Sequence, residues 1–423
     1  MSTLLREAAF LLRQRSAIVG VLILTLLATL ATGLGLAEVA RQQDSIARAV
    51  ALQAIDEAAV ARFVEDGGSA AYYRFHVAAD APSNLAFAAL GQRDLAPFIM
   101  RIRALALEGQ LYENESTNPE VALPGRFDFA FVLFYLAPLL LIALLHDLVS
   151  GEREAGRWTL LQSAPRSRGL WGARVLVRAL IVFAALGVPL CAGAMLSGAA
   201  PTGVLAALGV VALTVVFWTA VSLAVARSGW RSAVNATSLA AIWFGLTLVA
   251  PSAAHLVVNA IVPMPQGAEL LRANREAVHA GWDLPQDATM QRFFVTHPEW
   301  SDTPALRQPF HWKWYFAFQQ LGDEHVARQS QEYRDGIARR EALARTAGWV
   351  LPPLGLQQAL HRLAGTDGTA QLAYQQRVRE FHARLREFYY PYMFNEQPFR
   401  NTDFGLAPRF DTGAGSSRAS GQP

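Results

Sequence analysis

The chain has 423 residues, of which 52% are hydrophobic and only 17% are charged. This composition is too apolar for an ordinary soluble protein. The net charge of +3 comes almost wholly from arginine, because Lys313 is the only lysine, and no basic cluster is interleaved with aromatic residues as in a nucleic-acid-binding module. We therefore expect no nucleic-acid partner. The single cysteine, Cys191, excludes an intrachain disulfide and a Cys-x-x-Cys metal site.

Five long apolar runs predict an all-α polytopic membrane protein, because a helix that crosses a bilayer needs roughly 20 mostly apolar residues. Small residues and Pro201 supply a turn between the third and fourth spans. Pro251 divides the last run, so we expect the fifth span to end near residue 250 and a short re-entrant or interfacial segment to follow at 252–262. The predicted spans are residues 17–37, 129–146, 178–198, 203–226 and 232–250.

Two alternative interpretations of these runs are buried helices of a large soluble protein and, for the first run, a cleavable signal peptide. Five buried runs would need far more polar covering sequence than the chain contains. The first run is longer than the apolar core of a signal peptide, which has about 7–15 residues. We therefore favour membrane spans in all five cases.

The arginines predict the orientation of the spans, because short loops that face the cytoplasm retain positive charge. Arginines precede the first span and lie in the loops after the second and fourth, but the turn after the third has none. The amino terminus is therefore expected in the cytoplasm, with the spans in a bacterial-type inner (plasma) membrane. The remaining expected regions are an amphipathic helix on the inner membrane surface at 1–16, an extracytoplasmic region at 38–128, a cytoplasmic loop at 147–177, an extracytoplasmic domain at 263–411 and a disordered tail at 412–423.

Both extracytoplasmic regions are expected to be mainly helical. Residues 38–63 are rich in alanine and free of glycine and proline, which predicts a helix that continues out of the membrane. The second region contains two aromatic clusters, at 310–318 and 388–394. Such aromatics form a ligand-binding surface, the core of a small domain or an anchor at the lipid headgroups, and we favour the structural roles.

The sequence lacks the residues of several kinds of catalytic and transport site. A P-loop needs a lysine after its glycines, and no glycine loop precedes Lys313, so a conventional P-loop ATPase is not expected. We expect no catalytic residue and no cofactor in the chain. We also expect no metal site, since the spacing of His255, Met264 and Met290 is not diagnostic of one. The spans contain almost no ionisable residue, and His146 lies at a boundary, which disfavours an ion-coupled transporter.

The cytoplasmic loop after the second span has a pattern typical of a docking segment. Charged ends flank a short apolar helix with Trp158, Leu160 and Leu161, and Pro165 stops this helix. Such a segment docks into a groove on a cytoplasmic partner while the flanking charges set its orientation, and the alternative is an ordinary interfacial loop. The residues expected at the interface are Glu152, Glu154, Gly156, Trp158, Leu161, Pro165, Arg166 and Arg168.

We expect distinct roles for these interface residues. Glu152 and Glu154 are expected to pair with basic groups of the partner, and the two arginines at the end of the loop with acidic groups or lipid phosphates. Gly156 is expected to allow close packing where a larger side chain would clash. Trp158 is expected to be a buried anchor, since interface free energy concentrates in such residues at ~2 kcal/mol or more each.

The loop follows a recognisable order: an acidic residue, Gly-Glu-Arg-Glu-x-Gly at 151–156, an apolar turn, Ser-x-Pro at 163–165 and Ser-Arg at 167–168. This pattern closely resembles the coupling loop of type-2 ABC exporter permeases, and is nearest to the permeases grouped with multi-copper-enzyme maturation systems. Where that family has Gly-Thr-Leu, this chain has Gly-Arg-Trp, which fits a subgroup with large outer domains. Further similar segments are Asn118-Pro119, 125–128, 356–360 and Phe381-His382.

The resemblance implies the type-2 ABC exporter fold and a permease that acts as two copies, or with a sister permease, in the membrane lipid. Two copies of a separate ABC ATPase subunit, which carry the ATP and Mg, would grip the coupling loops, and ATP-driven closure would expel an unidentified substrate. The family usually has six spans. We find five, since the run at 349–359 is short and broken by Pro352, so the carboxyl terminus is expected outside unless a sixth span lies beyond this sequence.

Two other classes of function remain open at this point. A membrane-anchored sensor or scaffold would bind a ligand with its outer domain, but it would need a cytoplasmic output module, which the sequence lacks. A membrane enzyme would need a pair of Asp, Glu or His residues, which the spans lack. We favour the permease subunit, without enzyme activity of its own.

The arginine distribution yields a topology that reporter fusions test. Fusions after Ser45, Gly198 and Gly413 are expected to report an extracytoplasmic position, and fusions after Arg168 and Gly229 a cytoplasmic one. A cytoplasmic signal at Gly413 would reveal a further span that the charge pattern misses.

Overall fold

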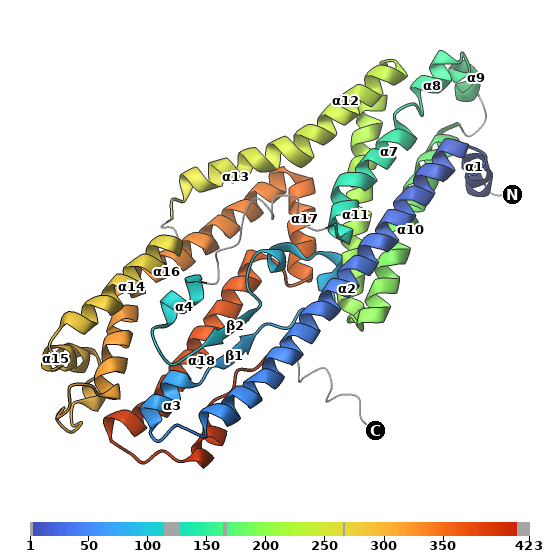
Figure 1. Ribbon diagram of the computed structural model, residues 1–423. Helices are drawn as coiled ribbons and strands as arrows, with labels where there is room; N and C mark the ends of the chain where they lie inside the picture. Colours follow the sequence, from blue (N-terminus) through green and yellow to red (C-terminus); the bar gives the residue numbers. More distant parts are fainter. Residues whose placement is uncertain (1–2, 114–126, 164–166, 265–266, 413–423) are drawn as a thin grey trace.

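The computed structural model describes residues 3–113, 127–163, 167–264 and 267–412, which are mostly helical (Figure 1). Several predictions fall outside the described residues. These are the tail from residue 413, the two loop residues Pro165 and Arg166, and the similar segments Asn118-Pro119 and 125–126.

Among the described residues, five helices are long and apolar enough to cross a membrane, which confirms the predicted number. The second and fifth each contain one π-helical stretch, and α2 packs on α10, which packs on α11. We call these five the span bundle. Its helices are α2 (Arg15–Val60); α6 (Phe129–Phe131), η3 (Val132–Leu136), α7 (Ala137–Leu145) and α8 (Ser150–Glu154) in succession; α10 (Ser167–Ser197); α11 (Pro201–Ala226); and α12 (Ser232–Phe244), η4 (Gly245–Val249) and α13 (Ala250–Ile261) in succession.

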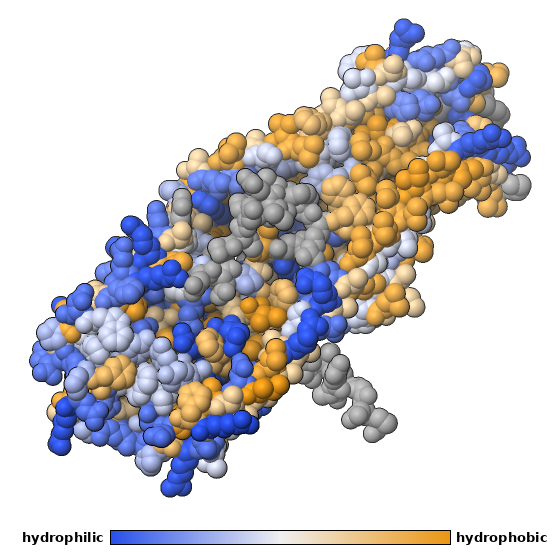
Figure 2. All heavy atoms as spheres, in the orientation of Figure 1, coloured by the Kyte–Doolittle hydropathy of each residue, from blue (hydrophilic) through white to orange (hydrophobic). Residues whose placement is uncertain are grey.

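The span bundle has an apolar outer surface. Along α2 the side chains of Leu22 and Leu26 are 61% and 67% exposed, and Leu213 and Val216 of α11 are also exposed. Figure 2 shows a broad hydrophobic band over the bundle, with polar surface beyond it at both ends of the molecule. An apolar belt of this extent is suited to lipid and not to water, so the chain is a membrane protein.

The helix of the predicted fifth span does not end at Pro251. It continues through Pro251 as α13, so residues 252–261 belong to the same helix as residues 232–250 and are not a separate segment. Proline has no N–H and its ring clashes with the carbonyl four residues earlier in an α-helix. The π-helical turn just before it, in which Ala250 N–H donates to Gly245 O, accommodates this change. Pro138 follows the π-helical η3 in the same way.

The remaining chain forms a large domain that is mainly helical, as predicted, and is built from both ends of the sequence. Its only strands among the described residues are β1 (His76–Ala79) and β2 (Ile99–Ile102), which pair antiparallel with His76 opposite Ile102. The helices of the large domain are α3 (Gly67–Tyr73), α4 (Leu107–Glu113), α14 (Gly267–Asp283), α15 (Gln286–Thr296), α16 (Trp312–Val350), α17 (Pro352–Leu363) and α18 (Gly368–Phe394). The uninterrupted α2 also runs into this domain, as predicted for residues 38–63.

Aromatic side chains form the core of the large domain. In the first predicted cluster Trp314, Phe316 and Phe318 are buried, and in the second Tyr389 and Phe394 are buried. They share one hydrophobic cluster with residues of α15 and α4. The structural role is therefore confirmed for these aromatics. The separate core of the span bundle also includes buried Leu360 and Ala364 from around α17, so α17 lies against α11 although it belongs to the predicted outer domain.

A short segment joins the two parts of the molecule, and we call residues 83–90 the junction segment. Its η1 turn (Ala86–Ala88) packs on α2. Phe87 is 1% exposed, and its carbonyl and ring fill the space that side chains at Gly35 of α2 and Gly193 of α10 would need. Only glycine permits so close an approach of the two backbones at residue 35.

Hydrogen bonds hold the junction segment at both ends. Asn84 Nδ2 donates to Gly198 O (2.9 Å) in the turn between α10 and α11, and Leu90 N donates to Asp128 Oδ2 (2.9 Å). The other carboxylate oxygen of Asp128 accepts from Phe131 N (2.9 Å) and caps α6. On the side of the large domain, Ser83 Oγ donates to Ala364 O (2.6 Å). The junction segment thus connects spans one to four with the α17–α18 turn.

Gly35→Ala is expected to destabilise the protein, because the new Cβ would collide with the carbonyl of Phe87. Overpacking of this kind costs about 1–3 kcal/mol of unfolding free energy. Gly33→Ala is the matched control, since a Cβ there has no neighbour within 4 Å on the same helix. Thermal unfolding of both variants in detergent measures the difference, and equal stability of the two would contradict the close packing at Gly35.

Candidate functional site

The predicted docking loop lies at the end of the molecule opposite the large domain (Figure 1). Two short helices form it, α8 (Ser150–Glu154) and α9 (Trp158–Ser163), next to α1 (Thr3–Leu11). α8 is aligned with the second span and is fastened to several neighbours by side chains. α9 is the part that projects.

Glu152 already forms ion pairs inside its own chain, and its predicted pairing with a partner's basic group stays a prediction. Its carboxylate accepts from Arg157 Nε (2.7 Å) and from Arg174 Nη1 (3.0 Å) of α10. Arg174 Nε also donates to Glu7 of α1 (3.2 Å). These ion pairs are shielded, since the side chains of Arg174 and Glu7 are 12% and 8% exposed. They join α8 to α1 and to the start of the third span.

Glu154 likewise has an internal role that the sequence did not reveal. Its Oε1 accepts from the backbone N of Ser232 (2.7 Å), the first residue of α12. The neighbouring Arg153 donates to Gly229 O (2.8 Å) in the turn before α12. Carboxylates stabilise the exposed N–H groups of a helix amino terminus. α8 is thereby attached to the first turn of the fifth span.

A buried polar contact strengthens this attachment between α8 and α12. Asn235 is completely buried, and its Nδ2 donates to His146 O (3.2 Å) and to Ser150 Oγ (3.3 Å). Ser232 Oγ donates to the same Ser150 Oγ (2.8 Å). Sequence analysis missed these residues, although a polar Asn235 within an apolar run is the kind of signal that marks a helix–helix hydrogen bond in a membrane.

Gly156 has a role within its own chain that the sequence did not reveal. No atom of the chain lies within 4 Å of where its Cβ would be, so no packing inside the chain requires glycine here. Its φ is +70°, and its N–H donates to Arg153 O (3.0 Å) at the end of α8. A left-handed residue at this position is the usual way to end a helix, and it favours glycine. Gly156 therefore sets the direction in which α9 leaves α8.

The apolar side chains of α9 are divided between internal packing and exposure. Trp158 is half-buried, with its ring 5.2 Å from that of Trp171 and with the Arg153 guanidinium 5.8 Å from its centre. Leu161 is also half-buried, whereas Leu160 is 71% exposed. Trp158 is thus partly covered by its own chain, and Leu160 offers the larger free apolar surface. The side chain of Arg168 lies outside the described ones.

The comparisons with known proteins concern the large domain. A family model described as a domain of unknown function (DUF3526) matches residues 268–412, which run from α14 past the carboxyl end of α18. No curated protein and no solved structure matches the chain. The span bundle and the docking loop are outside the matched family region.

Gly156→Ala is expected to loosen α9, because a left-handed conformation costs an L-residue about 1–2 kcal/mol. Local opening should then increase up to roughly tenfold. Trypsin digestion followed by mass spectrometry measures this as faster cleavage after Arg157. Gly151→Ala is the control, since a Cβ there makes only ordinary contacts with Asp147. Unchanged cleavage in Gly156→Ala would show that the turn does not depend on its φ.

Proposed function

We propose that the chain is the membrane-spanning permease subunit of an ABC exporter, which moves a substrate outward with energy from a separate ATPase subunit. The observation that carries the proposal is the construction of the loop at the α8–α9 end. α9 projects with an exposed Leu160, while α8 is bonded to α10 and α12, and through Arg174 of α10 it is linked to α1. An exposed apolar helix is suited to dock on a partner subunit. Because the neighbouring α8 is hydrogen-bonded to several spans, a displacement caused by the partner would be transmitted to the membrane helices.

The contacts of α8 define which helices such a displacement would reach. A displacement of α8 would act on α12 through Glu154 and Asn235, and on α10 through the pair of Glu152 with Arg174. Through Glu7 it would also reach α1, which leads directly into α2. The ion pairs of Arg174 with Glu152 and Glu7 are short and shielded from solvent. A displacement of one helix would therefore be transmitted directly to the helix paired with it. Three spans besides the second, of which α8 is the end, are thereby coupled to one loop.

In this proposal the partner performs the chemistry. Two ATPase subunits would bind the ATP and Mg and would contact α9 in each of two permeases, either two copies of this chain or one copy with a sister permease. The loop would lie in the cytoplasm and the large domain outside, as the arginine distribution favours. The large domain, with a core and a polar cleft of its own, also favours ligand binding outside the membrane as a second function.

Leu160→Ala is expected to weaken binding of the ATPase, because burial of a leucine in an interface is worth about 1.5–3 kcal/mol. The ABC protein expected to be encoded beside this chain should co-purify at roughly one tenth of its normal yield or less. Leu205→Ala on α11 is the matched control, since both leucines are 71% exposed and Leu205 lies at the other end of the span bundle. Equal co-purification with the two variants would refute docking at α9.

A further inference from the structure

The large domain contains a cleft of about 600 Å³ between α4, α16, α18 and the η5 turn (Pro298–Trp300). This volume is in the range of sites for small organic molecules. Five carboxylates and three guanidinium groups line the cleft, so its formal charge is −2. The two signs are not mixed evenly, because the arginines lie on the floor and two of the carboxylates lie on the exposed rim.

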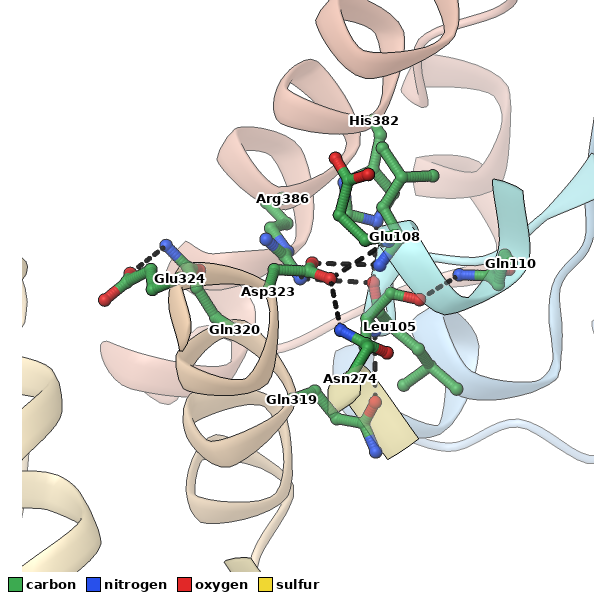
Figure 3. A network of polar contacts seen from close by, with 12 residues as sticks. Leu105, Glu108, Gln110, Asn274, Gln319, Gln320, Asp323, Glu324, His382 and Arg386 are labelled. Carbon is green, nitrogen blue, oxygen red and sulfur yellow. Dashed lines mark hydrogen bonds and ion pairs between the residues drawn. The ribbon is translucent and has the colours of Figure 1, made fainter. Parts of the chain in front are cut away.

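The floor is a rigid network of paired charges, part of which is visible in Figure 3. Asp323 of α16 accepts from Leu107 N and Glu108 N of α4 (2.9 and 3.0 Å), and Arg386 of α18 donates to it (2.7 Å). Glu108 accepts two hydrogen bonds from Arg379 of α18 (2.9 and 3.0 Å). These pairs fix three helices relative to one another and leave the floor no free carboxylate.

The protonation states of the floor follow from its surroundings. Burial by itself would raise the pKa of Glu108, but the hydrogen bonds and charge of Arg379 and the bond from Ser330 lower it below its usual value. Burial and the nearby Arg386 lower the pKa of His382. His382 is therefore neutral and donates from Nε2 to Leu105 O (2.7 Å). The carboxylates of the rim are thus not offset by a protonated histidine below them.

Two donors on the floor lack an acceptor. Arg379 Nη1 and Arg386 Nε are buried and have no hydrogen-bond partner among the described residues, while both side chains line the cleft. Buried polar groups in proteins are nearly always hydrogen-bonded. Both nitrogen atoms are shielded in this structure, so an occupant of the cleft that carries an oxygen acceptor would satisfy them once the two side chains turn toward it.

The rim presents negative charge beside an aromatic ring. Glu299 and Glu387 are exposed, and no ion pair joins either of them to a described cation. Trp300 lines the same cleft, half-buried against Tyr390 with the ring centres 6.0 Å apart. Carboxylates and an indole ring that line one cleft recognise organic cations through charge and cation–π attraction. A metal ion does not fit, since no group of three His, Cys, Asp or Glu among the described residues could hold one.

We propose that this cleft binds a small organic cation that also carries an oxygen acceptor, with the cation between Glu299, Glu387 and Trp300 and the oxygen toward the arginine floor. The inference does not depend on the proposed exporter function, because every group in it belongs to the large domain. Its failure is also distinguishable, since it predicts binding to the isolated full-length chain without any ATPase.

Calorimetric titration of the detergent-solubilised full chain tests the proposal with L-arginine, L-lysine and carnitine as probes and succinate as an anionic control. At least one of the three cations is expected to bind, and succinate is not. Glu299→Gln combined with Glu387→Gln should weaken that binding by roughly tenfold, since two partly exposed charge pairs contribute up to about 1 kcal/mol each. Trp300→Leu should weaken it independently.

The matched control is Glu276→Gln combined with Glu332→Gln, which changes the charge equally at two exposed glutamates outside the cleft. This variant is expected to bind the cation as the unmodified chain does. The proposal is overturned if none of the three cations binds, if succinate binds as well as they do, or if both double variants lose binding equally. Thermal unfolding of each variant shows that the fold is retained.

Discussion

The packing of Phe87 against Gly35 and Gly193 is the contact on which the rest of the structure depends. It places a large-domain loop directly on two spans, where a backbone carbonyl meets a helix that has no Cβ to keep it away. Around it, Asp128 and Asn84 bind the junction segment to the start of the second span and to the turn between α10 and α11. Buried loops are uncommon, because each of their backbone polar groups needs a hydrogen-bond partner. Here the buried Asp128 is the partner of the backbone N–H of Leu90.

Two continuous helices connect the loop end of the molecule with the large domain. α2 is a single helix of 46 residues that starts beside α1 and ends in the large domain. α12 to α13 is a second continuous path, from the first turn held by Glu154 to Val262, whose carbonyl accepts from Arg340 of α16 (2.8 Å). Stiff helices with fixed ends carry rigid-body displacement over their whole length. The proposed coupling through α8 therefore has a physical route to the large domain.

In the large domain, the residues that stabilise the fold are different from the rim residues of the proposed ligand site. Its aromatic core and its paired floor charges hold α4, α16 and α18 together, and burial of those charges is tolerable because each has a partner. The rim residues Glu299 and Glu387 take no part in this network. Side chains that do not stabilise the fold are available to bind a ligand. The proposed cation site therefore lies at the rim, above the paired charges of the floor.

The sequence by itself determined the membrane character, the number of spans and the position of the projecting loop, because charge-free length and arginine placement are local properties of the chain. It also indicated the structural role of the aromatics in the large domain. It could not indicate the partners of Glu152 and Glu154, since Arg174 and Ser232 are distant in the sequence and their approach depends on how the spans pack.

Tertiary structure alone decided the remaining features. The helix continues past Pro251 because a π-helical turn accommodates the missing N–H, and the φ of +70° favours glycine at residue 156. The cleft combines Glu108 with Asp323, Arg379 and Arg386, which are more than 200 residues away from it in the chain. Such long-range contacts follow from the shape of the packed helices, and no local pattern encodes them.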